Sequence, residues 1–332
     1  IDEHILYCEG QDQNFFGTSN LNVYKISENG KLININSQLK MKQDSNANPS
    51  LNHFCPKLIY YSTSSNNEKI LIEFNNLKNL FGLFRSSTAV YIKIKSGNFD
   101  NYENCATMFC DCSNLISIDL SNFSFKNIKY IYTFFGFCIN LEEIIWPNNK
   151  ENSLIDYPAN MFYLCSKLTS IDLSFFNFSK VKLMYGLFFN CYNLEKIILP
   201  KNILNIEDIH SMFNGCNKLT SIDLSNFNFN KTYNMSYLFY NCEKLNTIIW
   251  PKKTFFSSYD YCSYSHMFSN CHSLTSIDLS NFYIHGITDL SYMFSNCTNL
   301  ENIKLKGYLD WEKGQITIYI LVYHSNVIIN TS

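Results

Sequence analysis

A block of about 26 residues recurs nine times from residue 80 onward, and this repeat constrains the fold more than any other feature of the chain. Each block places apolar residues at i, i+3, i+4 and i+7, then a leucine and an isoleucine at three-residue steps. One block shows the pattern as Ile209, Met212, Phe213, Cys216, Leu219 and Ile222. A fixed period of this length predicts a solenoid, in which each unit buries its apolar face only against its neighbours.

The two halves of the block predict different secondary structures. The Leu-x-x-Ile-x-Leu part is short and alternating, which favours a strand. The spacing before it predicts a helix of about two turns, which is too short to stand alone and must be held by packing on the strand. This pattern is shown by Ile209–Cys216, Met235–Cys242 and Leu290–Cys297. We therefore expect an α/β solenoid, a stack of short parallel strands and short helices with about nine coils.

The regions outside the repeat predict caps. Residues 1–79 carry short apolar alternations between polar runs, and the exposed end of a solenoid needs an atypical cap. Residues 80–305 form the predicted solenoid. Residues 306–332 contain a polar turn and then an apolar run, which we expect to be a C-terminal cap strand.

The repeat also has a second, longer period, because successive blocks alternate between two types. One type reads Ile-Asp-Leu-Ser and the other reads Ile-Ile-Trp-Pro or Ile-Ile-Leu-Pro, so the full duplication is a pair of blocks. Trp146 and Trp250 occupy a slot that holds leucine elsewhere, which predicts core positions rather than a platform for sugar stacking. One phenylalanine per pair is expected to form a buried spine: Phe123, Phe176, Phe227 and Phe282.

Eight of the 13 cysteines occupy one slot of the repeat, namely Cys112, Cys138, Cys165, Cys191, Cys216, Cys242, Cys271 and Cys297. This placement predicts a structural ladder of buried, reduced thiols, and disulfides or metal binding are the alternatives. Neighbouring members point the same way, which is poor geometry for a disulfide. The oxidation state is left open for Cys8, Cys55, Cys105, Cys110 and Cys262, and in a secreted protein Cys8 and Cys55 would be able to staple the N-terminal cap.

The net charge of −2 gives no indication of a nucleic-acid partner. The longest apolar run, Ile316–Tyr323, is too short to span a bilayer, so no transmembrane segment is predicted in this chain.

The combined motif Met-Phe-x-x-Cys-x-x-Leu-x-x-Ile-Asp-Leu-Ser-x-Phe resembles the BspA-like class of leucine-rich repeat. It stands at Met108–Phe123, Met212–Phe227 and Met267–Phe282. The resemblance implies a curved leucine-rich-repeat solenoid with a recognition role, mostly in secreted or surface-attached proteins of microbes that act in adhesion and protein binding. It implies no catalytic residue and no defined ligand. The alternating Trp-Pro blocks depart from the class.

The candidate recognition face consists of outward strand positions. Because strand residues alternate, the side chains next to the core isoleucines face away from the core. The candidates are Asp119, Asp172, Asp223, Asp278, Glu143 and Lys196. The alternative is a solvated surface whose aspartates settle turn geometry. A row of metal sites is a third interpretation, although aspartates two coils apart are too far apart to share one calcium ion.

Other groups of residues give weaker indications of a metal site or of catalysis. Cys262, His266, Cys271 and His272 have metal-like spacing, but Cys271 belongs to the cysteine ladder and paired ligands are missing. We predict no metal site and no cofactor. No phosphate-binding loop, zinc-protease motif or nucleophile elbow occurs, so the sequence predicts no enzyme.

We therefore expect a non-catalytic module that binds a protein or an extracellular polymer, secreted or at the cell surface, with a cytoplasmic location as the alternative. A second interpretation is a structural protein that assembles end to end into a filament or coat. The apolar strand Ile316–Val322 favours it, because an unpaired edge strand invites another chain.

Overall fold

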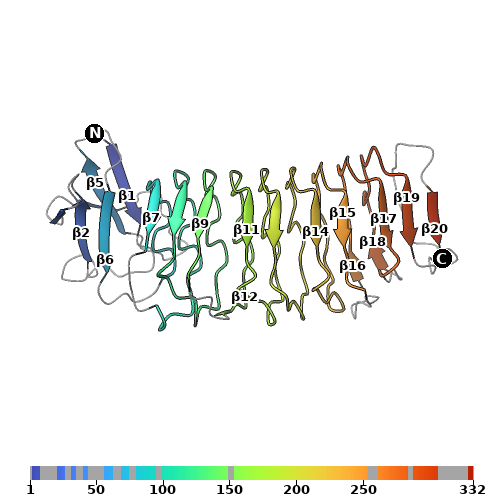
Figure 1. The fold of residues 1–332 in the computed structure, drawn as a ribbon, viewed down its shortest axis with the longest axis horizontal. Coiled ribbons are helices and arrows are strands. Elements are labelled where there is room, and N and C mark those ends of the chain that lie inside the picture. Colours follow the sequence, from blue (N-terminus) through green and yellow to red (C-terminus); the bar gives the residue numbers. More distant parts are fainter. Residues whose placement is uncertain are drawn as a thin grey trace.

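The computed structural model describes residues 2–7, 21–26, 31–34, 40–43, 56–62, 69–74, 80–94, 99–148, 153–252, 261–282, 287–305 and 328–331. In the repeat region the strands of successive repeats follow one another in chain order along the long axis of the molecule, and the two termini lie at opposite ends (Figure 1). The repeat region is a parallel-strand solenoid of about seven turns. The predicted count of nine coils stays a prediction.

The N-terminal part forms two small antiparallel sheets. One has the strand order β1-β5-β4 and the other β3-β2-β6. The strands are β1 (Asp2–Tyr7), β2 (Leu21–Ile26), β3 (Leu32–Asn34), β4 (Lys40–Gln43), β5 (Pro56–Ser62) and β6 (Lys69–Phe74). The antiparallel pairing contrasts with the parallel pairing of the repeats.

The main ladder of the solenoid is built from the Leu-x-x-Ile-x-Leu parts of the repeats. Its strands are β7 (Tyr91–Lys93), β8 (Ser117–Asp119), β9 (Glu143–Ile145), β11 (Ser170–Asp172), β13 (Lys196–Ile198), β14 (Ser221–Asp223), β15 (Thr247–Ile249), β17 (Ser276–Leu279), β19 (Asn302–Leu305) and β20 (Ile328–Thr331). They pair in parallel within the groups β7-β8-β9, β11-β13, β14-β15 and β17-β19-β20. The ladder is thus interrupted after β9, β13 and β15, the strands that precede Pro147, Pro200 and Pro251.

Two further ladders run along the other sides of the solenoid. One contains β16 (Tyr261–Ser263) and β18 (Ile287–Asp289), and its line is continued by bridges such as Asp208 with Asn234. The other contains β10 (Ser153–Leu154) and β12 (Phe176–Asn177), with a bridge between Ile203 and Phe227.

The segments predicted to be short helices are stacked turns instead, and the part of the chain that the structure describes contains no α-helix. We call them turn segments: Leu80–Ser87, Cys105–Cys112, Ile131–Cys138, Pro158–Cys165, Met184–Cys191, Ile209–Cys216, Met235–Cys242, Tyr264–Cys271 and Leu290–Cys297. The prediction was wrong for Ile209–Cys216, Met235–Cys242 and Leu290–Cys297, and the α/β class is not supported.

Hydrogen bonding explains why these segments do not form helices. In the turn segment Ile209–Cys216, alternate N–H groups donate to carbonyls three residues earlier in the same segment. Four of the remaining N–H groups donate to the next repeat, as from Ile209 to Asn234 and from Phe213 to Leu238, each at 3.0 Å, and that of His210 donates to the Asp208 side chain. This alternation satisfies the backbone without the i to i−4 bonds of a helix.

Two residues in every turn segment adopt a left-handed backbone conformation, which no right-handed helix tolerates. They stand five positions and one position before the cysteine slot. In one segment they are Ser211 (φ 55°) and Gly215 (φ 76°), and in another Tyr237 (φ 57°) and Asn241 (φ 58°).

The core lies between the turn segments and the strands. The apolar spacing that suggested a helix does identify it, since Ile209, Met212, Phe213 and Cys216 are all fully buried. One phenylalanine per turn segment forms a continuous column, with neighbouring rings stacked at centroid distances of 5.3 to 5.8 Å. The column consists of Phe84, Phe109, Phe135, Phe162, Phe188, Phe213, Phe239, Phe268 and Phe294.

Aromatic side chains pack across two of the interruptions in the main ladder. The ring of Trp146, after β9, lies 5.3 Å from that of Phe175 and 5.8 Å from that of Phe176. Trp250, after β15, lies 4.9 Å from Phe282. Both tryptophans are half-buried against the core, which agrees with their predicted core role, and the four phenylalanines of the predicted spine are buried.

Candidate recognition surface

The outward positions of the main-ladder strands form what we call the strand face. In β14, Ser221 and Asp223 are exposed while Ile222 between them is buried, and β17 alternates in the same way. In β9, β13 and β15 the outer two residues are exposed and the central isoleucine is half-buried. Parallel register stacks equivalent outward residues into rows that run along the solenoid.

All four aspartates of the candidate face hold the turn that follows their strand. The carboxylate Oδ1 of Asp119, Asp172, Asp223 and Asp278 accepts a hydrogen bond from the N–H two residues later, at 2.8 to 2.9 Å. This local bond is the usual role of aspartate in turns. The turn-geometry interpretation therefore describes one function of every member of the row.

The two outer aspartates are also ion-paired. Lys93 Nζ lies 2.6 Å from Asp119 Oδ2, and Lys304 Nζ lies 3.1 Å from Asp278 Oδ2. The bonds from Lys93 and then Ser121 lower the pKa of the buried Asp119 to about 2. At Asp278 burial raises the pKa, but hydrogen bonds from Ser280 and the Lys304 ammonium outweigh it, so the pKa lies below its ordinary value.

The middle of the row has a different composition. Asp172 lies opposite Ile198 in the neighbouring strand, and Asp223 lies opposite Ile249. Ile145, Ile198 and Ile249 are 41%, 40% and 51% exposed, which places three large apolar side chains in solvent at alternate repeats. This central stripe combines exposed apolar groups with carboxylates.

The two remaining candidates occupy the parallel row two residues earlier. Glu143 in β9 and Lys196 in β13 are exposed. They face Ser117 and Ser170 in the neighbouring strands. The structure thus places all six predicted surface residues on the same side of the solenoid, but Asp119 is buried.

The eight ladder cysteines are free thiols and are buried. Each Sγ donates to the backbone carbonyl of the column phenylalanine in the preceding repeat, at 2.9 to 3.3 Å. Burial raises the pKa of Cys165, Cys216 and Cys271 well above the ordinary thiol value. Because the thiolate is the reactive form, the raised pKa disfavours reaction of these side chains with oxidants.

The residues with metal-like spacing point to different partners. Cys271 Sγ lies 3.2 Å from the Phe239 carbonyl, whereas the ring of His266 stacks between Tyr237 and Tyr292. In the described part of the chain, no three His, Cys, Asp or Glu side chains gather in a group that would hold a metal ion.

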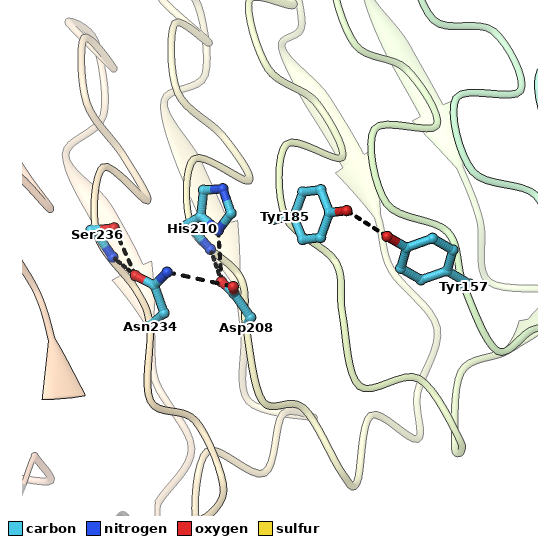
Figure 2. A network of polar contacts seen from close by, with 6 residues as sticks. All are labelled: Tyr157, Tyr185, Asp208, His210, Asn234 and Ser236. Atoms are coloured by element: carbon cyan, nitrogen blue, oxygen red, sulfur yellow. Dashed lines mark hydrogen bonds and ion pairs between the residues drawn. The ribbon is translucent and has the colours of Figure 1, made fainter. Parts of the chain in front are cut away.

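A polar network on the turn side was not predicted from the sequence (Figure 2). Asp208 Oδ1 accepts hydrogen bonds from the His210 N–H at 2.9 Å and pairs with His210 Nδ1 at 2.8 Å. The His210 ring stacks on Tyr185, whose hydroxyl contacts that of Tyr157. Asp208 Oδ2 also accepts from Asn234 at 3.4 Å.

The sequence does carry a signal for part of this network, namely the recurrence of Asn or Asp at one position of the repeat. Among the described residues, the slot of Asp208 holds Asn or Asp in four repeats, and each of these side chains accepts a hydrogen bond from the N–H two residues later. An Asp–His pair orients an imidazole, as in acid–base catalysis. The hydroxyl of Ser236, however, donates to Asn234 Oδ1 at 2.7 Å and not to His210. The contacts of Asp208 with Asn234 and of His210 with Tyr185 therefore join neighbouring repeats to one another.

Comparison with known proteins gives the following matches. No curated protein matches the chain. A crystal structure of a leucine-rich repeat protein from Bacteroides ovatus is 17% identical, covering 76% of this chain and 86% of that one, with a TM-score of 0.25. The described residues contain no apolar helix of membrane-spanning length.

Two family models match the sequence. The model described as a Mycoplasma protein of unknown function, DUF285, matches residues 158–260. The model of the BspA-type leucine-rich repeat region matches in six copies over residues 84–208 and 236–311, which is more than half of the chain. The alternating blocks and their cysteine slot are therefore a variant of that repeat, and the chain belongs to the BspA-type leucine-rich repeat family.

Proposed function

We propose that this chain is a non-catalytic module that binds another protein through the central part of its strand face. The observation that carries the proposal is the row of exposed isoleucines, Ile145, Ile198 and Ile249. Repeated exposure of large apolar side chains on one rigid surface is typical of protein-binding sites. Membership of a leucine-rich repeat family supports the same role, because such repeats serve as protein-interaction modules.

The rigid scaffold supports binding energetically. The side chains of the central stripe stand on strands whose inner residues pack against the core, so ordering the surface costs little when a partner binds.

We further propose that the module acts outside the cell or at its surface, in adhesion, with a protein or another extracellular polymer as partner. The protected thiols are compatible with this setting, because buried thiols of raised pKa resist oxidation. Cys8 and Cys55, the predicted staple of the N-terminal cap, lie outside the described residues. So does Ile316–Val322, on which the filament interpretation rests.

A peptide-display experiment tests the binding site. Immobilised wild-type chain is used to select from a library of random peptides, in parallel with the variant Ile145→Thr/Ile198→Thr/Ile249→Thr. Threonine keeps the β-branched shape that suits a strand while removing most of the apolar surface. A matched control is Tyr130→Thr/Tyr192→Thr/Leu204→Thr, which changes three equally exposed apolar residues elsewhere.

The expected result is enrichment of peptides by the wild type and the control variant but not by the isoleucine variant. Thermal unfolding of all three proteins checks that the fold is retained. Equal enrichment by the isoleucine variant would place binding on another surface.

A further inference from the structure

Seven consecutive turn segments carry no residue of fixed charge. From Ile131–Cys138 to Leu290–Cys297, none of these segments contains aspartate, glutamate, lysine or arginine, although these types make up 16% of the chain. Charged side chains return just outside the segments, as at Asp208 and Asp289 before them and at Lys218 after the cysteine slot. The solvent-facing side chains of the seven segments therefore form an uncharged surface, which we call the turn face.

The two histidines of the turn face add no unbalanced charge at neutral pH. His210 is paired with Asp208 at the border, with 2.8 Å between Nδ1 and Oδ1 (Figure 2). At His266, burial outweighs the charge of Asp289 and lowers the pKa below its ordinary value, so the ring is uncharged. A partner with fixed charges would find no counter-charge on this face, and removing water from those charges would be unfavourable.

The turn face is continuous, unlike the strand face. Each of the first six segments donates three or four main-chain hydrogen bonds to the following one, as from Phe188 to Met212 at 2.8 Å. Backbones joined in this way lie about 4.8 Å apart, so six intervals make a face roughly 29 Å long. A regular face of this length suits an extended partner.

Two stacks of rings supply apolar surface on the turn face. The first stack is Phe137, Tyr163 and Phe189, and the second is Tyr237, His266 and Tyr292. Within both stacks, neighbouring ring centroids lie 4.6 to 5.2 Å apart. Because each ring is held by the next, little conformational freedom is lost when a partner covers them.

The turn face also offers hydrogen-bonding groups to a partner. Three hydroxyls of the stacks have no hydrogen-bond partner in the part of the chain that the structure describes, those of Tyr163, Tyr237 and Tyr292. A ladder of amides runs beside them, with Asn270 Nδ2 donating to Asn241 Oδ1 at 2.6 Å and Asn296 Nδ2 to Asn270 Oδ1 at 2.8 Å. Each of these donating amides keeps a second N–H for a partner.

We propose that the turn face binds a neutral polysaccharide, which lies along the solenoid across the turn segments. Such a polymer brings hydroxyls to the tyrosine hydroxyls and asparagine amides, brings C–H groups to the rings, and has no charge to desolvate. A protein fits the face less well, because charged residues lie mostly on protein surfaces and would be covered without a counter-charge. The inference goes beyond the proposed function, since the turn face shares no residue with the strand face.

Surface plasmon resonance tests the class of partner. The full chain is immobilised and titrated with three soluble neutral polysaccharides, dextran, galactomannan and xyloglucan, and with alginate as the acidic comparison. We expect at least one neutral polymer to bind, equally well at low and at high salt, because no ion pair contributes. Alginate should not bind.

A triple variant locates the contact. Tyr163→Phe/Tyr237→Phe/Tyr292→Phe removes the three hydroxyls and keeps every ring of both stacks. We expect the dissociation constant of the bound polysaccharide to rise about tenfold, because three hydrogen bonds are lost. Tyr91→Phe removes an exposed hydroxyl from β7 on the strand face and should leave binding unchanged, as should the isoleucine variant. Thermal unfolding checks that each variant keeps the fold.

The outcomes keep the two proposals apart. Unchanged binding by the tyrosine variant, loss of binding in the isoleucine variant, or binding of alginate alone would each contradict the inference, and so would failure of all the polymers to bind. If display-selected peptides require the three tyrosine hydroxyls and no polysaccharide does, the turn face is a protein interface instead. The proposed function is decided separately, by whether the isoleucine variant still enriches peptides.

Discussion

The turn segments and the strands of the same repeats are joined to their neighbours in different ways. At the junction of β13 with β14 the strands are not paired, yet the turn segments there are linked by four main-chain hydrogen bonds, including Met184 to Asp208 and Phe188 to Met212. Continuous bonding on one side holds the stack together. The strand side, which is paired only in groups, is therefore available to present side chains to a partner.

The difference in burial follows the difference in bonding. The turn segments carry the phenylalanine column and the buried thiols, whereas the central strand residues of β9, β13 and β15 are only half-buried. We expect most of the unfolding free energy to depend on the turn side, and binding of a protein partner to depend on the strand side.

Phe213→Ala should have the largest effect. Phe213 is fully buried and stacks between Phe188 and Phe239, so truncation should lower the free energy of unfolding by about 3 to 5 kcal/mol. Ile198→Ala, on the strand face at 40% exposure, should cost less than about 1 kcal/mol. Urea unfolding measures both. Equal losses would show that the two sides contribute equally.

Asp119→Asn should cost about 1 kcal/mol at pH 7. The variant keeps the acceptor for Ser121 but loses the ion pair with Lys93. The pKa of Asp119 in the folded protein is about 2, below the value of about 3.9 in unfolded chains, so ionisation favours folding. The stabilisation is complete above about pH 4 and is lost as the pH falls through about 2.

The matched control for this variant is Asp223→Asn, at an exposed position of the same row. It should change the free energy of unfolding by less than about 0.5 kcal/mol, as is usual for an exposed surface position. If the cost of Asp119→Asn did not shrink between pH 4 and pH 2, the ion pair would not be its cause.

Cys216→Ser should lower stability by about 1 kcal/mol. The thiol donates to the Phe188 carbonyl at 3.3 Å, and a serine hydroxyl in the same place has a donor for that acceptor, although its preferred distance is shorter. Native wild type should react slowly with a thiol reagent and rapidly in denaturant, because burial raises the pKa of Cys216. Rapid reaction of the native ladder would show that the turn side opens readily.

Sequence reasoning identified the core but not the backbone that holds it. Spacing of i, i+3, i+4 and i+7 marks residues on one side of the chain, and both a helix and a turn segment bury that side. The distinguishing signal was the position before the cysteine slot, which holds asparagine in four repeats and glycine at Gly215. These residues tolerate left-handed backbone best, so their recurrence indicates turns and not helices.

On the strand face, the alternation of core and surface was predictable from the two-residue period of a strand. The pairing of Asp278 with Lys304 also followed from parallel register, because both occupy the same slot in adjacent repeats. The pairing of Asp119 with Lys93 did not, because the first repeat is one residue out of step with the others. The contact between Tyr157 and Tyr185 depends on ring orientations that no repeat slot encodes.

Leu164→Asn should have a small effect on stability, and the sign of that effect separates a turn segment from a helix. Leu164 is half-buried and left-handed, with φ 63°, a conformation that costs a leucine roughly 1 to 2 kcal/mol. Asparagine relieves part of that cost and loses some apolar contact, so we expect a net gain of about 0.5 kcal/mol. In a helix the same change would cost up to about 0.7 kcal/mol, because asparagine is the poorer helix former.

Leu164→Val is the control: a β-branched residue is least suited to positive φ and should be destabilising in a turn segment. Unfolding in urea gives the free energy of unfolding of the wild type and of both variants. A lower stability of Leu164→Asn with little change for Leu164→Val would favour the helix.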